Sequence, residues 1–426
     1  MASFFIPLTG LESDSTALNT IANDLSNMNT TAFKAQTTNF SDLFYQQIGA
    51  TGADDPIQVG AGVRVASNET NFTQGTLNST GNSTDVALNG NGFFVASDGS
   101  GGYEFTRAGD FTQDSNGNLV TSNGLSVMGY PAVNGVVNTN APLAAINIPV
   151  GAVQEPNATT TLNMTANLDS ASATGTQFPA QVTVYDSLGE AHQATVTYQQ
   201  TATNTWSYSV ALPASDFTSG VSTPVTGTMI FNAGGNLTTV TPTGGAAGTV
   251  GTAPGDVTSI PLGFTGLADG AKNLSMSWNL MGSGGTPSIS QVDTASAVAA
   301  TTQNGYTSGQ YQNFTIGSDG TVTVTYSNGE KQNVGQLALA NVTNLQGLTL
   351  LGDGDYATTL ASGTAAIAKS GSSGLATLTD GSLEASNVNI SSEFSDLIIA
   401  QRAFEASSKA VTTFDQITQD TINMVH

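Results

Sequence analysis

The hydrophobic positions of this chain follow a helical period at its two ends and a strand-like alternation between them. The C-terminal stretch has no Gly or Pro after Asn389, a residue type that caps helix N-termini. Apolar or small residues recur there at intervals of three, four and seven. They are Phe394, Leu397, Ala400 or Gln401, Phe404, Val411, Phe414, Thr418, Thr421 and Val425. This pattern predicts a helix of about nine or ten turns, and a stripe of this length favours packing on another helix over an ordinary core position.

A second amphipathic helix is predicted near the N-terminus. Thr9 and Glu12 have the spacing of a capping box, which puts the helix start at Thr9 or one turn earlier. The helix is expected to run to about Asn29, and its apolar positions form two heptad series, Leu11, Leu18 and Leu25 beside Ile21 and Met28. Two terminal helices that pair with each other bring the chain ends together, so the middle of the chain becomes an insertion.

The middle of the chain has the alternation of β-strands. Val182 and Val184 alternate before the turn Asp186-Ser-Leu-Gly189, and Ala194, Val196 and Tyr198 alternate after it. Similar segments run over residues 63–150, 150–288 and 289–381, whereas residues 34–62 have irregular spacing and are expected to form an extended or partly helical connector.

Composition narrows the classes of partner. The 8 Lys and Arg against 31 Asp and Glu give a net charge of −23, so nucleic acids and anionic membranes are improbable partners. The chain has no Cys, which excludes disulfides and thiolate chemistry. It begins without the basic and apolar regions of a cleavable signal peptide, yet its Thr-, Asn- and Gly-rich strands are typical of extracellular surfaces. We therefore expect a signal-independent export route and no membrane insertion.

Residues with catalytic or binding chemistry are scarce. The two histidines, His192 and His426, lie in unlike contexts, and nothing resembles a nucleophile elbow. Gly90-Asn-Gly92 lacks the third glycine of a dinucleotide fingerprint, and Asp114-Ser-Asn-Gly-Asn118 lacks the Gly and Glu of a calcium loop. We expect no enzyme, no catalytic residue, no cofactor and no metal. Arg402 has two readings: a solvated pair with Glu405 in the same helix, or a bridge to a neighbouring chain.

Short motifs at both ends and through much of the middle occur together in this chain. They are Thr9-Gly-Leu11, Ile21 to Lys34, Gln74 to Asn82, Asn91 to Phe94, Thr106 to Phe111, Tyr185 to Gly189 with His192, Tyr326 to Gly329, Gly335 to Ala340, Ser386 to Phe394, and Ala400 to Phe404 with Ser408-Lys409. Jointly they resemble the axial proteins of the bacterial flagellum, most closely the hook type. One departure is Ala32, where the family usually has Gly before Phe33.

The resemblance implies a multidomain structural protein with a terminal α-helical coiled-coil domain and nested all-β domains. The expected domains are residues 1–33 with 382–426 as an inner-tube helical domain, 34–62 as a connector, 63–149 with 289–381 as a discontinuous first β-domain, and 150–288 as an inserted outer β-domain. Assembly contacts are expected at Leu11, Leu18, Ile21, Leu25, Met28, Phe33, Phe394, Leu397, Gln401, Arg402, Phe404, Val411, Phe414 and Val425.

The implied function is a subunit that polymerises into a flexible helical tube, the universal joint between basal body and filament. The implied partners are copies of itself, the distal rod, the hook cap, the hook–filament junction proteins and the flagellar type III export apparatus, and the implied location is the extracellular hook. A distal rod protein and a secreted adhesin or surface-layer protein are the alternatives. The large inserted segment 150–288 argues against the first, and the paired terminal helices argue against the second.

Overall fold

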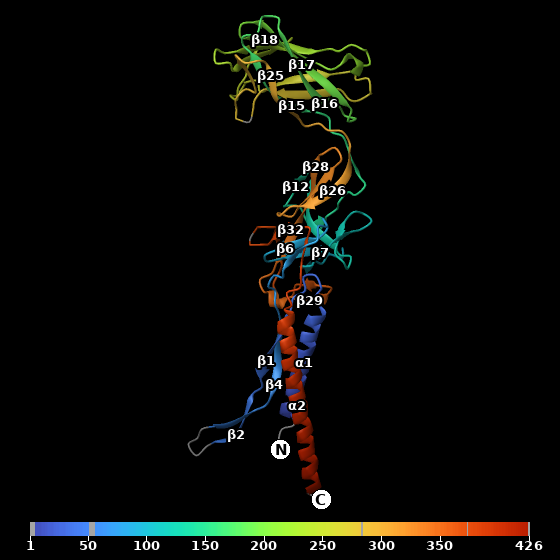
Figure 1. The fold of residues 1–426 in the computed structure, drawn as a ribbon, viewed down its shortest axis with the longest axis vertical. Helices are drawn as coiled ribbons and strands as arrows, with labels where there is room; N and C mark the ends of the chain where they lie inside the picture. Colours follow the sequence, from blue (N-terminus) through green and yellow to red (C-terminus); the bar gives the residue numbers. More distant parts are fainter. Residues whose placement is uncertain (1–4, 51–55, 283, 373, 425–426) are drawn as a thin grey trace. The chain divides into compact units, whose positions relative to one another are not determined.

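The computed structural model describes residues 5–50, 56–282, 284–372 and 374–424 (Figure 1). The chain forms two compact units. The terminal unit contains Met1–Val150, Asn313–Val324 and Lys331–His426, and the inserted unit contains Gly151–Gln312 and Thr325–Glu330. None of the described helices combines the length and the apolarity that crossing a membrane requires.

The two terminal helices are α1 (Phe5–Ser26) and α2 (Ile390–Met424). The predicted cap of α2 is confirmed, because the Asn389 side-chain oxygen accepts hydrogen bonds from the backbone amides of Ser391 and Ser392 at 3.1 and 3.3 Å. α1 begins at Phe5, the earlier of the two predicted starts, whereas the predicted capping role of Thr9 is wrong. Thr9 lies inside the helix, and its hydroxyl donates to the carbonyl of Ile6 at 2.8 Å rather than capping an amide. Pro7 does not prevent the earlier start, because first-turn amides need no helical acceptor.

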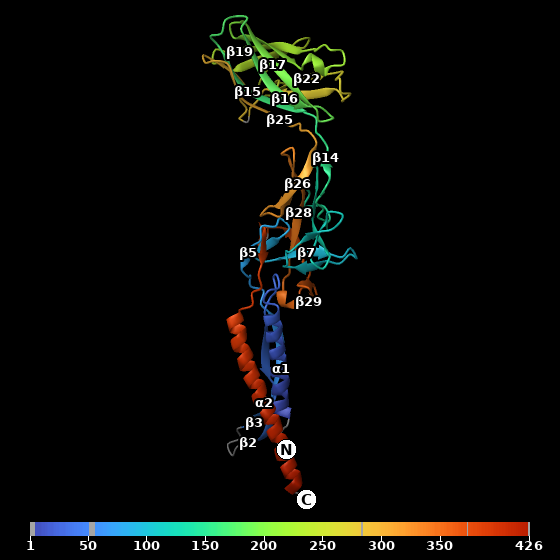
Figure 2. The ribbon, with the colours of Figure 1, turned by 45° about the vertical axis from the view of Figure 1, so that its right-hand side comes forward.

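The two helices pack against each other in opposite directions (Figure 2). The fold that pairs the chain ends, predicted from the two apolar stripes, is therefore confirmed. β1 (Gln36–Asp42) pairs antiparallel with β4 (Val63–Thr70) and both lie against α1, while β2 (Tyr45–Ala50) pairs with β3 (Pro56–Gly60) in a separate two-stranded sheet. The segment 34–62, expected to form an extended or partly helical connector, is extended in most of its described residues, which form the strands β1, β2 and β3.

A larger sheet forms the rest of the terminal unit. Its strands run in the order β28 (Lys331–Asn341), β11 (Ser126–Val133), β7 (Phe93–Ser97), β8 (Glu104–Thr106), β30 (Asp355–Ala357) and β29 (Thr349–Gly352). Shorter strands flank it: β9 (Thr112–Gln113), β10 (Leu119–Val120), β12 (Val136–Val137), β13 (Ala144–Ala145) and β31 (Ala366–Lys369). Phe93, Phe105 and Tyr356 lie in its core.

Two further strand pairs connect the sheet region to the helices. β6 (Val86–Asn89) pairs with β32 (Thr377–Asp380), and β5 (Leu77–Ser79) pairs with β33 (Ser382–Glu384). β33 ends six residues before α2 begins. The 3₁₀ turn η2 (Leu345–Gly347) connects β28 to β29.

The inserted unit is built from two sheets that share one hydrophobic core. One sheet has the order β16 (Gln177–Tyr185), β17 (Ala191–Ala202), β18 (Thr205–Ala211), β19 (Val225–Phe231), β20 (Leu237–Pro242) and β21 (Gly248–Thr249). The other has the order β22 (Ser259–Phe264), β23 (Leu274–Asn279), β15 (Thr161–Asp169) and β24 (Ile289–Val292), with β25 (Ala297–Gln303) also on β15. Trp206 and Tyr198 from the first sheet and Trp278 from the second are buried in this core.

The inserted unit continues beyond the boundary expected at residue 288. β24 and β25 both pair with β15, so these strands complete the second sheet of the inserted unit. β14 (Val153–Gln154) also belongs to this unit, whereas β26 (Gly309–Ile316) and β27 (Thr321–Tyr326) have residues in both units.

Candidate assembly surface

The seam between α1 and α2 covers only one side of α2. No described residue of α2 is fully buried. Along α2, half-buried residues recur at alternating intervals of four and three: Glu393, Leu397, Ala400, Phe404, Ser407, Val411 and Phe414. This is the a/d spacing of a coiled coil. Ser407 donates a hydrogen bond to the Asp14 carboxylate at 2.9 Å, and Gly10 allows the close approach at this point because a β-carbon there would lie 3.2 Å from the Ser407 hydroxyl.

Beside the seam, α2 carries a second set of apolar side chains that nothing in the described chain covers. Ile390, Phe394 and Ile398 are spaced four residues apart and lie on one face, with Phe394 53% exposed. Ile399, Ile417, Ile422 and Met424 are exposed as well. An apolar face along a solvent-exposed helix marks an interaction site, because water penalises leaving such a surface uncovered.

The end of α2 extends beyond the helix pair. Every residue from Asp415 to Met424 is exposed. This segment continues a helix that is already nucleated, but it lacks the packing from which helices in proteins gain most of their stability. A partner for this segment must therefore be sought outside the described chain.

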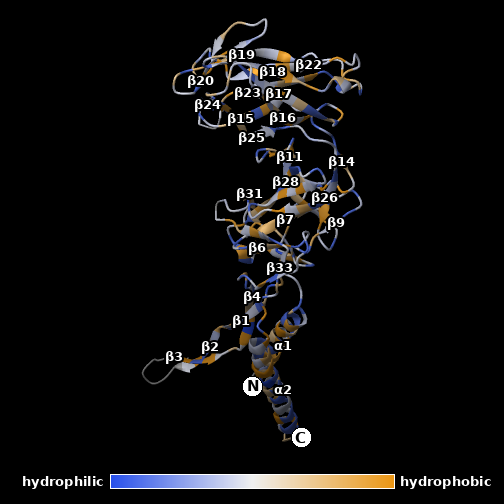
Figure 3. Ribbon diagram, turned by 45° about the horizontal axis from the view of Figure 1, so that its top comes forward, coloured by the Kyte–Doolittle hydropathy of each residue, from blue (hydrophilic) through white to orange (hydrophobic). Residues whose placement is uncertain are grey.

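The hairpin of β2 and β3 is the third uncovered apolar element. Tyr45, Ile48, Ile57 and Val59 are all exposed, as is Phe44 just before β2, at 78%. Figure 3 colours parts of the β2–β3 ribbon as hydrophobic. The two strands pair only with each other. A two-stranded ribbon is marginally stable by itself, so its apolar side chains also call for a partner surface.

A buried ion cluster joins three distant segments of the terminal unit. Glu384, at the end of β33, accepts from the Lys34 ammonium at 2.6 Å and from the Arg107 guanidinium at 3.0 Å. Both cations also donate to backbone carbonyls. Lys34 donates to the carbonyl of Thr73 at 2.8 Å, and Arg107 donates to the carbonyls of Gly90 and Gly92 at 3.0 Å each. Burial lowers the pKa of Lys34, and its bond to Glu384 opposes that shift.

The cluster fixes the segments that lead into both helices. Lys34 lies eight residues after α1 ends and Glu384 lies six residues before α2 begins. The backbone amide of Ala32 donates to the Glu384 carbonyl at 2.8 Å, and the Ala35 amide donates to the Asn387 side chain at 2.8 Å. The orientation of the helix pair relative to its own β-sheet region is therefore set by charge-assisted bonds in a buried site.

An acidic groove of about 310 Å³ lies between α1, α2 and β1. Asp14, Glu393 and Asp396 line it together with Phe40 and Ile399. Asp24 is buried near its rim, where it accepts from the Gln36 amide at 2.7 Å. Burial raises the pKa of Asp24 to about 6. Burial, then the charges of Asp24 and Asp396, raise the pKa of Glu393.

The predicted assembly residues fall into two groups. Leu11, Leu18, Ile21, Leu25, Phe33, Leu397, Phe404, Val411 and Phe414 are half-buried, whereas Met28, Phe394, Gln401 and Arg402 are exposed. Val425 lies outside the described residues. Met28 follows the last residue of α1, in the turn after it. Arg402 is 78% exposed and pairs with Glu405 at 3.2 Å in the same helix.

Sequence reasoning missed the ion cluster. The available signal was that Lys34 and Arg107 lie in two of the recognised motifs of a chain with only 8 Lys and Arg. In such a chain, a cation placed among apolar residues is worth examining for a buried partner. The Glu384 partner could not be chosen, because it lies 350 residues from Lys34.

Family models match three stretches of the chain. The flagellar basal body protein FlaE D2 domain matches residues 157–306, and the flagellar hook protein FlgE/F/G D1 domain matches residues 87–166. The flagellar basal body rod FlgEFG protein C-terminal model matches residues 379–424. The last match covers α2 and the approach to it, and the first covers most of the inserted unit.

Similar proteins cover the whole chain. The flagellar hook protein FlgE of Salmonella typhimurium is 35% identical over 436 residues, covering 99% of this chain and 100% of that protein. FlgE of Treponema pallidum is 34% identical over 464 residues, covering 100% of this chain and 99% of that protein. The crystal structure of Helicobacter pylori flagellar hook protein FlgE2 covers 72% of this chain and 100% of its own, with a TM-score of 0.55 and 14% identity, which shows a common fold.

Proposed function

Because the chain belongs to the flagellar hook protein family, we propose that it is the structural subunit of a bacterial flagellar hook. In this proposal copies of the chain polymerise into a flexible helical tube that transmits torque from the basal body to the filament. The family is structural, and the proposed role is mechanical rather than catalytic. Full-length relatives named as hook proteins, together with the inserted unit, favour the hook over the distal rod.

The observation that carries the proposal is the uncovered apolar surface of α2. Its seam with α1 leaves Phe394 and Ile398 exposed, and every described residue after Phe414 is exposed as well. Contacts between different patches of identical subunits generate a helical polymer when the rotation does not close. The β2–β3 hairpin supplies a second uncovered patch on the same unit.

The same proposal includes the partners and the export route. The chain would meet the distal rod at one end of the polymer, and the hook cap and hook–filament junction proteins at the other. It would leave the cell through the flagellar type III export apparatus without a cleavable signal peptide. Helices that gain most of their stability from packing are suited to this route, because they can order on assembly.

Two truncations of the purified chain test the assembly surface. Ending the chain after Phe414 removes the exposed part of α2, so the monomer should unfold at the wild-type urea concentration but no longer form tubes. Ending it after Asn389 removes all of α2 while keeping Glu384 and the Asn387 hydrogen bonds. This variant should also remain monomeric, with both β regions folded. Tubes formed by either variant, seen by sedimentation and electron microscopy, would refute α2 as the assembly element.

A further inference from the structure

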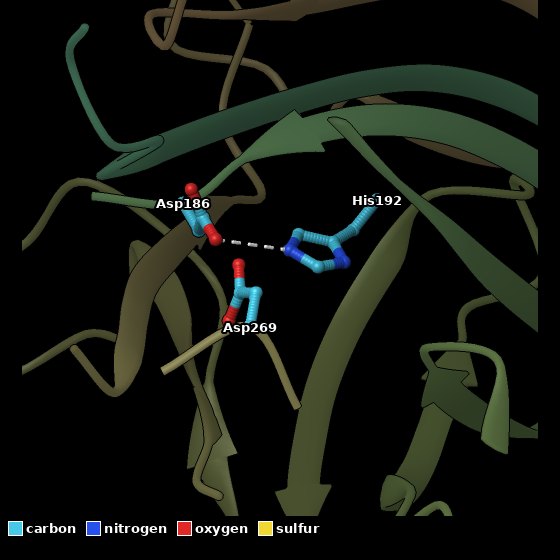
Figure 4. Close-up of side chains that lie close together, drawn as sticks. All are labelled: Asp186, His192 and Asp269. Atoms are coloured by element: carbon cyan, nitrogen blue, oxygen red, sulfur yellow. Dashed lines mark hydrogen bonds and ion pairs between the residues drawn. The ribbon is translucent and has the colours of Figure 1, made fainter. Parts of the chain in front are cut away.

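One cluster of polar side chains in the inserted unit is separate from the assembly surface. Asp186, His192 and Asp269 have ligand atoms that all lie within 4.8 Å of one another (Figure 4). Asp186 and His192 are buried, while Asp269 is exposed. The cluster brings together the turn after β16, the start of β17 and the loop between β22 and β23.

Each buried group is held in a fixed orientation. One carboxylate oxygen of Asp186 (Oδ1) accepts from the backbone amides of Leu188 and Glu190 at 2.8 and 3.0 Å. Its other oxygen (Oδ2) lies 3.3 Å from Nε2 of His192. The second ring nitrogen of His192 (Nδ1) lies 2.9 Å from the carboxylate of Asp216, in the 3₁₀ turn η1 (Ala214–Asp216).

The loop that carries Asp269 is fastened to the same segments. The amide of Ala268 donates to the carbonyl of Asp216 at 2.9 Å, and the amide of Lys272 donates to the Ser187 hydroxyl at 3.0 Å. Asp269 itself accepts from the amide of Ala271 at 2.9 Å. The three groups are therefore preorganised by backbone bonds on both sides of the exposed carboxylate.

The charges of this cluster call for a cation. Three carboxylates surround one imidazole, and in the described part of the chain no Lys or Arg forms an ion pair with any of them.

We propose that Asp186, His192 and Asp269 bind a divalent transition-metal cation such as Zn²⁺. A zinc ion about 2.0–2.1 Å from each ligand separates neighbouring ligand atoms by roughly 3.3 Å, and Nε2 of His192 already lies 3.3 Å from Asp186. Asp216 supplies the carboxylate that metal-binding histidines bind through their other ring nitrogen. Exposed Asp269 leaves an entry path and an open position for water.

The bound ion would fasten the β16–β17 turn to the β22–β23 loop. These segments belong to opposite sheets of the inserted unit, so the ion would join the two sheets at one edge. Binding to the folded state alone stabilises that state in proportion to the logarithm of metal concentration over Kd.

Calorimetric titration of the full-length chain with ZnCl₂, after removal of metal with a chelator, tests the site. One zinc ion per chain should bind, and the thermal midpoint of the inserted unit should rise with zinc. Asp269→Asn should weaken binding at least tenfold. Because Asp269 is exposed, this variant should fold as the wild type does.

Asp293→Asn is the matched control, since Asp293 is an exposed aspartate of the same unit outside the cluster. It should bind zinc as tightly as the wild type, and Mg²⁺, which prefers all-oxygen sites, should give no thermal shift. Absence of stoichiometric zinc binding would overturn the proposal. Equal zinc affinity in Asp269→Asn, or an equal shift with Mg²⁺, would do so as well. These outcomes do not bear on tube formation, which the truncations of α2 test separately.

Discussion

Lys34 and Glu384 lie 350 residues apart and form a fully buried ion pair at 2.6 Å. Arg107 completes the cluster from the loop after β8. Lys34 follows α1 and Glu384 precedes α2, so both helices leave the sheet region at this joint. We infer that the joint determines the direction in which the helix pair projects.

The Glu384→Gln variant should strongly destabilise the terminal unit. Among the described residues, Glu384 is the only carboxylate that forms an ion pair with Lys34 or Arg107. The substitution therefore leaves two buried cations without a counter-charge. Breaking a buried pair in this way costs about 3–5 kcal/mol. Urea unfolding followed by circular dichroism measures the loss. Glu69→Gln, at an exposed site on β4, should shift the midpoint little, and an equally small shift for Glu384→Gln would contradict the role of the joint.

Gly109 should be intolerant of any side chain. A β-carbon at this position would lie 1.7 Å from the carbonyl oxygen of Val86, so Gly109→Ala must displace backbone next to the Arg107 segment. Backbone displacement in a packed region costs about 1–3 kcal/mol or more. Gly102→Ala is the control, since nothing lies within 4 Å of its added carbon. Thermal unfolding should separate the two variants, and equal midpoints would contradict the packing seen around Gly109.

Local signals in the sequence were enough to predict the helices and the cap of α2, but not the contacts that join distant segments. The Asn389 cap follows from one side chain and the amides two and three residues on, so the sequence predicts it directly. The half-buried positions Leu397, Phe404, Val411 and Phe414 follow from helical spacing. In contrast, the ends of the Lys34–Glu384 bond meet only after β5 has paired with β33, and no local pattern encodes that register.

The errors have the same origin. Thr9 has capping-box spacing, but its hydroxyl accepts from the amide of Val63 at 3.3 Å, a contact made only once β4 lies against α1. Similarly, spacing does not show that Asp269 and Asp216 converge on His192, because they lie on different loops. The absence of a metal site, expected on motif grounds, stays a prediction, and the site proposed above has no motif of contiguous ligands.

The free energy of unfolding of the helix pair should decrease as the pH rises from about 4 to about 6. Burial raises the pKa of Asp24 to about 6 from its ordinary 3.8. The folded state therefore holds a proton that the unfolded chain has released, and this contribution is lost as the pH rises through the folded pKa. Glu393, whose pKa is raised by burial and then by the charges of Asp24 and Asp396, acts in the same direction.

Asp24→Asn should remove the part of this slope that belongs to Asp24. Asparagine keeps an oxygen for the Gln36 amide, so the variant should be more stable than the wild type by about 1–3 kcal/mol at pH 7 and nearly equal to it at pH 4. Denaturant unfolding at several pH values measures the difference. Asp42→Asn, at an exposed site on β1, should differ from the wild type by a pH-independent amount. A pH-independent difference for Asp24→Asn would contradict the raised pKa.

The two faces of α2 should respond differently to substitution. Replacing Phe394 and Ile398 by Ser should change the free energy of unfolding of the monomer by less than about 0.5 kcal/mol each, because both are exposed. The critical concentration for polymerisation should nevertheless rise at least tenfold. Phe404→Ala, on the seam with α1, should instead lower the thermal stability of the helix pair. Unchanged polymerisation in the Phe394 and Ile398 variant, measured by sedimentation, would exclude this face from the subunit contact.

Substituting Arg402 tests whether its guanidinium binds only within its own helix or also to a neighbouring subunit. Its pair with Glu405 is exposed, and such pairs contribute only a few tenths of a kcal/mol, so Arg402→Ala should leave the monomer unchanged. If the guanidinium bridges to an acidic groove on a neighbouring copy, polymers of the variant should dissociate at lower urea or after shorter dilution. Lys409→Ala, one heptad further along α2 and also exposed, is the matched control for the loss of one charge. If polymers of Arg402→Ala and Lys409→Ala are equally stable, any loss of polymer stability is due to the change in net charge and not to a specific bond from Arg402. Arg402 would then belong to the intrahelical pair alone.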